Sequence, residues 1–127
     1  MPKFALERID CIEGKQVFEK LLIDDQCQFD EFEKEISKND KLYSELGKIY
    51  SYMEFVANGE SLPATKFKDI TPKKKKIKEY EFKSKNLRVY AIKKEKGKII
   101  ILGGFKNRQK RDIRKFRSIK QRYIEAQ

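Results

Sequence analysis

The segment 80–117 decides the fold that we expect, and it reads YEFKSKNLRVYAIKKEKGKIIILGGFKNRQKRDIRKFR. Residues 78–83 and 87–92 alternate between two sets of side chains, as half-buried strands do, whereas residues 99–102 are continuously apolar, as in a strand buried on both faces. Charged turns separate the three runs. The segment therefore predicts a three-stranded antiparallel meander, which the chain leaves through Gly103-Gly104.

A basic helix is expected to follow the last strand. Its apolar stripe is Ile113, Phe116, Ile119, Tyr123 and Ile124. Cationic residues crowd its start, namely Lys106, Arg108, Lys110, Arg111, Arg114, Lys115 and Arg117. A helix N-terminus favours acidic side chains, so these cations weaken the helix slightly and phosphate binding explains them better.

Two helices are predicted upstream of the meander. The first spans about 27–37, with Phe29, Phe32 and Ile36 on one face. The second follows the N-cap pair Asn39-Asp40, ends at Asn58-Gly59, and buries Leu42, Leu46, Ile49, Met53 and Val56. The fold class that we expect is α+β, with this helix pair packed on one face of an antiparallel sheet of three to five strands, and a C-terminal basic helix.

The remaining segments are a hairpin and a linker. Residues 3–24 predict a β-hairpin extension with core positions Ile9, Val17, Phe18, Leu21 and Ile23, although residues 16–23 also suit a helix. The hairpin could extend the sheet or dock a partner. Residues 61–76 are typical of a linker, and their run Lys73-Lys74-Lys75-Lys76 is either a solvated loop or an electrostatic arm that binds RNA.

Length and composition bound the class of protein. A chain of 127 residues with 39% hydrophobic residues predicts one domain, 1–127. Residues 1–63 carry 8 Lys/Arg and 14 Asp/Glu, a net charge of −6, whereas residues 64–127 carry 23 and 6, a net charge of +17. A half this basic attracts phosphate over long range. We therefore expect a polyanion as the partner.

Metal sites and membrane insertion are not expected. Cys11 and Cys27 are the only cysteines and histidine is absent, so we expect small buried thiols in their reduced form, no metal and no cofactor. No apolar run reaches 18 residues and no signal peptide precedes the first strand. The sequence thus predicts a cytoplasmic protein without a membrane partner.

The order of short phrases in this chain resembles the RelE/ParE superfamily of bacterial toxins, and most closely its HigB-like, phage-derived branch. Tyr80-Glu81-Phe82-Lys83 is similar to the branch's Tyr-Glu-Leu-Arg strand, and Leu87-Arg88-Val89-Tyr90 to its aromatic-Arg-Val-Tyr strand. The apolar strand and Gly104-Phe105-Lys106 are similar to a Gly-Phe-x-Lys phrase before the last helix. The resemblance covers about residues 27–125.

The resemblance implies a toxin that cleaves mRNA in the ribosomal decoding site and is neutralised by a cognate antitoxin, expected to be a helix-turn-helix protein. In that reaction the ribose 2′-hydroxyl attacks the adjacent phosphate. By position, the resemblance assigns phosphate stabilisation to Lys83 and Arg88 on the sheet and to Lys106 and Arg108 after it. Arg111 and Arg114, with the four lysines at 73–76, are the expected RNA-binding set.

The general base of such a reaction is unassigned by the sequence. Some family members use histidine or a tyrosine early in the last helix, and this chain has neither there. Glu81, Tyr90 and Lys83 are the candidates on the sheet. The alternatives to a nuclease are a non-catalytic toxin of the same fold, acting on gyrase, and a basic nucleic-acid-binding module.

Overall fold

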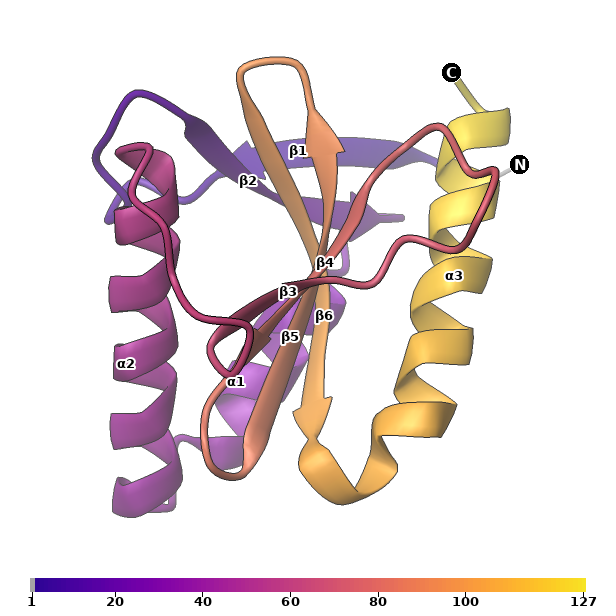
Figure 1. Ribbon diagram of the computed structural model, residues 1–127. Coiled ribbons are helices and arrows are strands. Elements are labelled where there is room, and N and C mark those ends of the chain that lie inside the picture. Colours follow the sequence, from indigo (N-terminus) through magenta and orange to yellow (C-terminus); the bar gives the residue numbers. More distant parts are fainter. Residues whose placement is uncertain (1) are drawn as a thin grey trace.

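A computed structural model describes residues 2–127, in which one six-stranded sheet is covered by helices on both faces (Figure 1). The strands lie in the order β1-β2-β6-β5-β4-β3. In chain order the elements are β1 Phe4–Arg8, β2 Val17–Ile23, α1 Gln28–Ile36, α2 Asp40–Ala57, β3 Phe67–Asp69, β4 Glu79–Lys83, β5 Leu87–Lys94, β6 Gly97–Phe105, a 3₁₀ turn Lys106–Arg108 and α3 Gln109–Glu125.

The α+β class is confirmed, but the expected sheet is too small and of the wrong kind. The meander β4-β5-β6 is antiparallel as expected. However, β2 pairs with β6 in parallel, which makes the sheet mixed, and β3 adds a sixth strand within the segment 61–76 that was expected to be a linker. The rest of segment 61–76 contains no helix or strand, as expected of a linker, and β3 was missed because three residues are too few for a visible period-2 pattern.

The N-terminal hairpin extends the sheet. β1 and β2 pair antiparallel, so the helical alternative for residues 16–23 is excluded. Val17 lies opposite Gly97 of β6, where an added Cβ would lie 2.8 Å from the Val17 carbonyl carbon. This close approach requires glycine. Phe18 and Leu21 are buried as expected, whereas Val17 is 37% exposed and is not a core residue.

The helix pair covers one face of the sheet, as expected. Asn39 caps α2 by accepting a hydrogen bond from the backbone N–H of Leu42, at 3.1 Å, and Asn58 lies at the C-cap. Phe29, Phe32 and Ile36 of α1 are buried against the sheet together with the α2 stripe. The two periodicities in the sequence therefore identified the faces that pack on the core.

Helix α3 covers the opposite face, alone. Phe116 and Ile119 pack on the β5 and β6 side chains of that face, and Tyr90 stacks on Phe116 at 5.5 Å between ring centroids. The molecule thus has three layers, with α1 and α2 on one side of the sheet and α3 on the other (Figure 1).

Two local predictions were wrong. Gly103-Gly104 was expected to end the sheet, but both residues lie within β6, which continues to Phe105. Cys27 is buried at the N-cap of α1, whereas Cys11 is exposed rather than buried. None of the helices within residues 2–127 is both long and apolar enough to cross a membrane.

Candidate nucleic-acid interface

A cleft of about 630 Å³ lies between α1 and the start of α3, at the end of β6. It exists because β2 pairs with β6 only from Gly97 to Ile100, after which β2 pairs with β1 alone. The rest of β6 thus has no partner strand on that side, within the sheet as described. The backbone of Leu102, Gly103 and Gly104 contributes the cleft floor.

Glycines let both helices approach this floor. A Cβ on Gly103 would lie 2.8 Å from Cε2 of Phe32 in α1, and a Cβ on Gly104 would lie 2.9 Å from Cγ of Asp112 in α3. Real Cβ atoms do not make such contacts. The Gly-Gly pair therefore serves the packing of α1 and α3 on opposite faces of one strand, and not a turn.

The cleft walls carry five cations and three carboxylates. The cations are Lys34, Lys38, Arg108, Arg111 and Lys115, and the carboxylates are Glu31, Glu35 and Asp112. The spacing 108, 111 and 115 puts three cations on one side of the 3₁₀ turn and α3. Lys115 reaches across to α1, where its Nζ donates to Oε1 of Gln28 at 2.7 Å.

Asp112 is the group in the cleft whose chemistry stands out. Asp112 is only 6% exposed, and the nearest cation is Arg111, whose Nε lies 3.6 Å from Oδ1 of Asp112. Burial raises the pKa of the Asp112 carboxyl, although Arg111, Lys115 and Arg108 oppose the change. A carboxylate with a raised pKa, surrounded by cations, can accept a proton from a phosphate ester's neighbouring hydroxyl.

Arg88 lies close to this cleft in the sheet but does not line it. It pairs with Gly104 across β5 and β6 and is 6% exposed beneath α3. Its guanidinium Nη1 donates to the carbonyl oxygens of Ser84, at 2.6 Å, and Leu87, at 2.8 Å, while Nε has no hydrogen-bond partner among the described residues. Arg88 is therefore enclosed in this structure, with its Nη1 held by backbone carbonyl oxygens.

The sheet candidates for a general base are also enclosed. Glu81 is 1% exposed and its Oε2 accepts from Nε2 of Gln109 at 2.7 Å. Tyr90 is fully buried, and its hydroxyl has no partner within residues 2–127. Lys83 is half-buried on β4 opposite Arg88, and its Nζ is 3.4 Å from the carbonyl oxygen of Ala64.

Lys106 and Arg108 are exposed, as a phosphate-binding role requires. Both line a second hollow of about 530 Å³ together with Asn86, Phe105 and Asn107. The guanidinium of Arg108 lies 5.6 Å from the Phe105 ring centroid. Because Phe105 and Arg108 line both hollows, the second hollow continues the first around the 3₁₀ turn.

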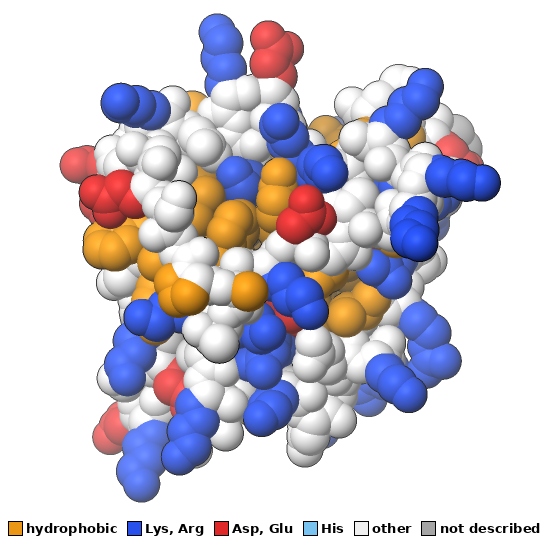
Figure 2. All heavy atoms as spheres, in the orientation of Figure 1, with side chains coloured by type: hydrophobic (Ala, Val, Ile, Leu, Met, Phe, Trp, Pro, Cys, Tyr) orange, Lys and Arg blue, Asp and Glu red, His pale blue; other side chains and the backbone are white. Residues whose placement is uncertain are grey.

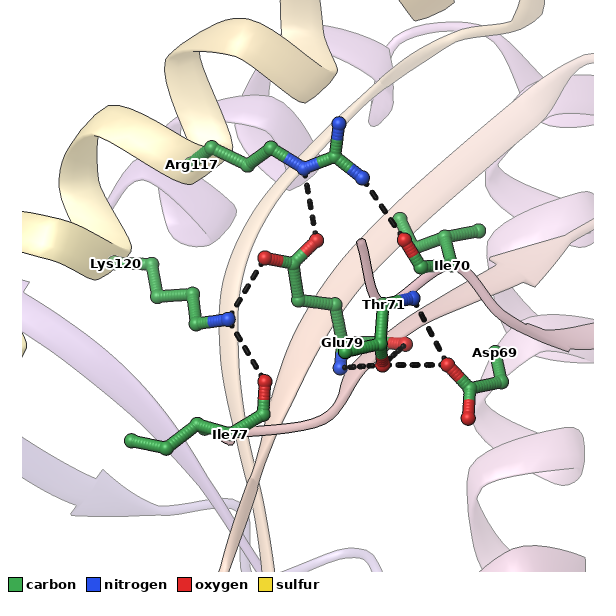
Figure 3. A network of polar contacts seen from close by, with 7 residues as sticks. All are labelled: Asp69, Ile70, Thr71, Ile77, Glu79, Arg117 and Lys120. Carbon is green, nitrogen blue, oxygen red and sulfur yellow. Dashed lines mark hydrogen bonds and ion pairs between the residues drawn. The ribbon is translucent and has the colours of Figure 1, made fainter. Parts of the chain in front are cut away.

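The four lysines at 73–76 lie at the other end of α3 from the cleft, and Arg114 is exposed but does not line it. Beside the lysines, Glu79 binds α3: its carboxylate accepts from Arg117 Nε at 2.9 Å and from Lys120 Nζ at 2.7 Å (Figure 3). Lys120 and Arg117 also donate to the carbonyls of Ile77 and Ile70. This network fastens the lysine loop to α3 and separates it from the cleft.

Basic side chains also spread well beyond the cleft. Figure 2 shows Lys and Arg side chains over α3 and along the lower end of the molecule, with a hydrophobic area between them. No group of three or more Cys, Asp or Glu side chains within residues 2–127 is arranged to hold a metal ion. The cleft therefore offers cationic side chains and one enclosed carboxylate.

Sequence reasoning missed Lys34, Lys38 and Asp112. The two lysines were not predicted because every phosphate-binding candidate was placed in residues 73–114, within the basic half of the chain. Asp112 was missed because its importance depends on Gly104, which alone leaves room for its carboxylate. The acid in the first turn of a basic helix was the available signal.

Comparisons with protein-family models, with curated proteins and with solved structures find no match to this chain.

Proposed function

We propose that this protein is a toxin of the RelE/ParE kind that cleaves ribosome-bound mRNA, with the cleft between α1 and α3 as its RNA site. The observation that carries the proposal is the enclosed carboxylate of Asp112 beside Arg108, Arg111 and Lys115. The resemblance of segment 80–106 to the HigB-like branch independently supports an mRNA-cleaving toxin, although Lys83 and Arg88, to which it assigns phosphate stabilisation, do not line the cleft.

In this proposal Asp112 is the general base that the sequence left unassigned. Its carboxylate takes the proton from a ribose 2′-hydroxyl, and the 2′-oxygen attacks the adjacent phosphorus. Negative charge grows on the phosphoryl oxygens, where Arg108 and Arg111 stabilise it. The bond to the 5′-oxygen then breaks, that oxygen takes a proton from water, and the products are a 2′,3′-cyclic phosphate and a 5′-hydroxyl end.

The charge distribution supports an RNA substrate over a small phosphate ester. Residues 64–127 carry a net charge of +17, and exposed cations continue from the cleft to Lys106 in the adjoining hollow. Such a field accelerates encounter with a polyanion and makes binding depend on salt. Lys73 to Lys76, at the far end of α3, would contact ribosomal RNA rather than the scissile phosphate.

A non-catalytic toxin is the second candidate, directed at gyrase or acting as a basic nucleic-acid-binding module. The burial of Arg88 favours it, because the family resemblance assigns phosphate stabilisation to a residue that is only 6% exposed. In either proposal the protein acts in the cytoplasm with a cognate antitoxin, expected to be a helix-turn-helix protein, and without a cofactor or metal.

Induced expression with mapping of new mRNA ends tests the proposal. The wild type is expected to arrest growth and to produce codon-phased ends, and Asp112→Asn is expected to abolish both. Arg88→Ala distinguishes the cleft from the sheet residues that the family resemblance assigns. If this variant still cleaves mRNA, the reaction takes place in the cleft and does not require Arg88. Growth arrest with intact mRNA would support the non-catalytic candidate instead.

A further inference from the structure

We propose that Lys98 is a reactive amine at the base of a pocket separate from the cleft, where it binds small apolar aldehydes as a Schiff base. The pocket has a volume of about 310 Å³ and is lined by Gln16, Val56, Gly59, Glu60, Ser61, Leu62, Phe67 and Lys98. It lies at the start of β6, whereas the α1/α3 cleft lies at the end of that strand. The inference is therefore independent of the proposed nuclease.

Lys98 is buried without a carboxylate partner. It is 6% exposed, and within residues 2–127 no Asp or Glu oxygen lies within ion-pair distance of its Nζ. Nζ donates to Oε1 of Gln16 at 2.7 Å. Three aromatic rings surround it, with centroids 5.0 Å away for Tyr80, 5.7 Å for Phe18 and 5.8 Å for Phe67.

The other buried lysine shows what a structural role requires. Lys120 has its Nζ between the Glu79 carboxylate and the carbonyl of Ile77, so its charge is neutralised and two of its three donors are used. Lys98 has a neutral amide and ring faces instead. Burial, with repulsion from Lys93, lowers the pKa of Lys98 to about 8. A substantial fraction of the amine is then neutral near physiological pH and can act as a nucleophile.

The pocket determines which carbonyl compound fits. Val56, Leu62 and Phe67 provide apolar walls, and no cation other than Lys98 lines the pocket, so a carboxylate or phosphate on the ligand would find no second cation there. The neutral amine attacks the carbonyl carbon, and the resulting carbinolamine loses water to form the imine. The amine and the aldehyde give imine and water, so no oxidant or reductant is needed.

Reductive trapping with benzaldehyde tests this site in the full-length protein. Benzaldehyde with cyanoborohydride, which reduces the imine, should leave a benzyl group on Lys98, found by peptide mass analysis. Labelling of Lys98 at pH 7.5 is expected to exceed that of exposed Lys74 by on the order of 100-fold, since at this pH the neutral fraction of an ordinary lysine is smaller by about that factor. Lys120 should remain unlabelled.

Two further results must agree. Ser61→Trp, which fills the pocket and leaves Lys98 in place, should reduce labelling of Lys98 without changing that of Lys74. The rate at which Lys98 is labelled should rise with pH and then level off, and the midpoint of the rise should lie near pH 8. Labelling of Lys98 no faster than that of Lys74, or as low as that of Lys120, would overturn the proposal and leave Lys98 as a packed structural cation.

Discussion

Gly104→Ala tests the contact on which the geometry of the cleft depends. The new Cβ would lie 2.9 Å from Cγ of Asp112 and closer still to Oδ2, so either α3 or the carboxylate must move. Overpacking of this kind costs about 1–3 kcal/mol in free energy of unfolding. Either movement displaces the Asp112 carboxylate from its position over Gly104, so RNA cleavage should also be lost.

A double-mutant cycle separates this contact from a general effect on β6. In the Asp112→Ala background the clash is absent, so Gly104→Ala should cost less than about 0.5 kcal/mol, leaving a coupling energy of about 1–3 kcal/mol. Gly47→Ala is the matched control, because an added Cβ there meets nothing within 4 Å on an exposed helix position. It should stabilise the protein by about 0.5–1 kcal/mol.

Urea unfolding followed by far-ultraviolet circular dichroism measures the four free energies of the cycle. An equal cost of Gly104→Ala with and without Asp112 would show that the contact between these two residues does not set the cost. The same conclusion would follow if Gly104→Ala left both stability and RNA cleavage unchanged.

Three other predictions concern charge. Glu79→Gln should lower the free energy of unfolding by about 3 kcal/mol, because it leaves buried Lys120 without its counterion. Urea unfolding of this variant, compared with Lys120→Met, measures the loss, and a loss under about 1 kcal/mol would contradict the prediction. Folding lowers the pKa of Lys98 to about 8, so between about pH 8 and pH 10.5 the unfolded chain binds more protons than the folded protein. The free energy of unfolding should therefore rise by up to about 3 kcal/mol across that pH range, and Lys98→Met should flatten the rise in unfolding measurements at several pH values. Equal slopes of unfolding free energy against pH in the wild type and in Lys98→Met would contradict this prediction. RNA binding should weaken steeply as the salt concentration rises. Arg111→Gln should reduce the slope of log K against log salt by about 0.7 in titrations with single-stranded RNA. An unchanged slope would show that Arg111 does not contact an RNA phosphate.

The sequence predicted most of the elements because their signals are local. The stripes of α1, α2 and α3 and the apolar run at 99–102 depend on residues a few positions apart. The parallel pairing of β2 with β6 could not be predicted, since it joins residues about 80 positions apart through a contact of Val17 with Gly97. The short strand β3 acquires its structure from pairing with β4.

The candidate site was predicted in part. Arg108 and Arg111 do line the cleft, because the crowding of cations after β6 is visible in the sequence. The accessibility of Arg88 could not be predicted, since alternation gives the face of a strand but not the helix that covers that face. Asp112 became a candidate only when the position of α3 over Gly104 was known.

Single-turnover cleavage of mRNA on programmed ribosomes, with purified protein, tests whether RNA is cleaved in the cleft between α1 and α3. Asp112→Asn should lower the rate at least 100-fold. The wild-type rate should fall at low pH with a midpoint above the ordinary pKa of aspartate. Lys74→Gln, far from the cleft, should retain the wild-type rate. The products should carry 2′,3′-cyclic phosphate ends. An unchanged rate in Asp112→Asn, or no cleavage by the wild type, would contradict the account.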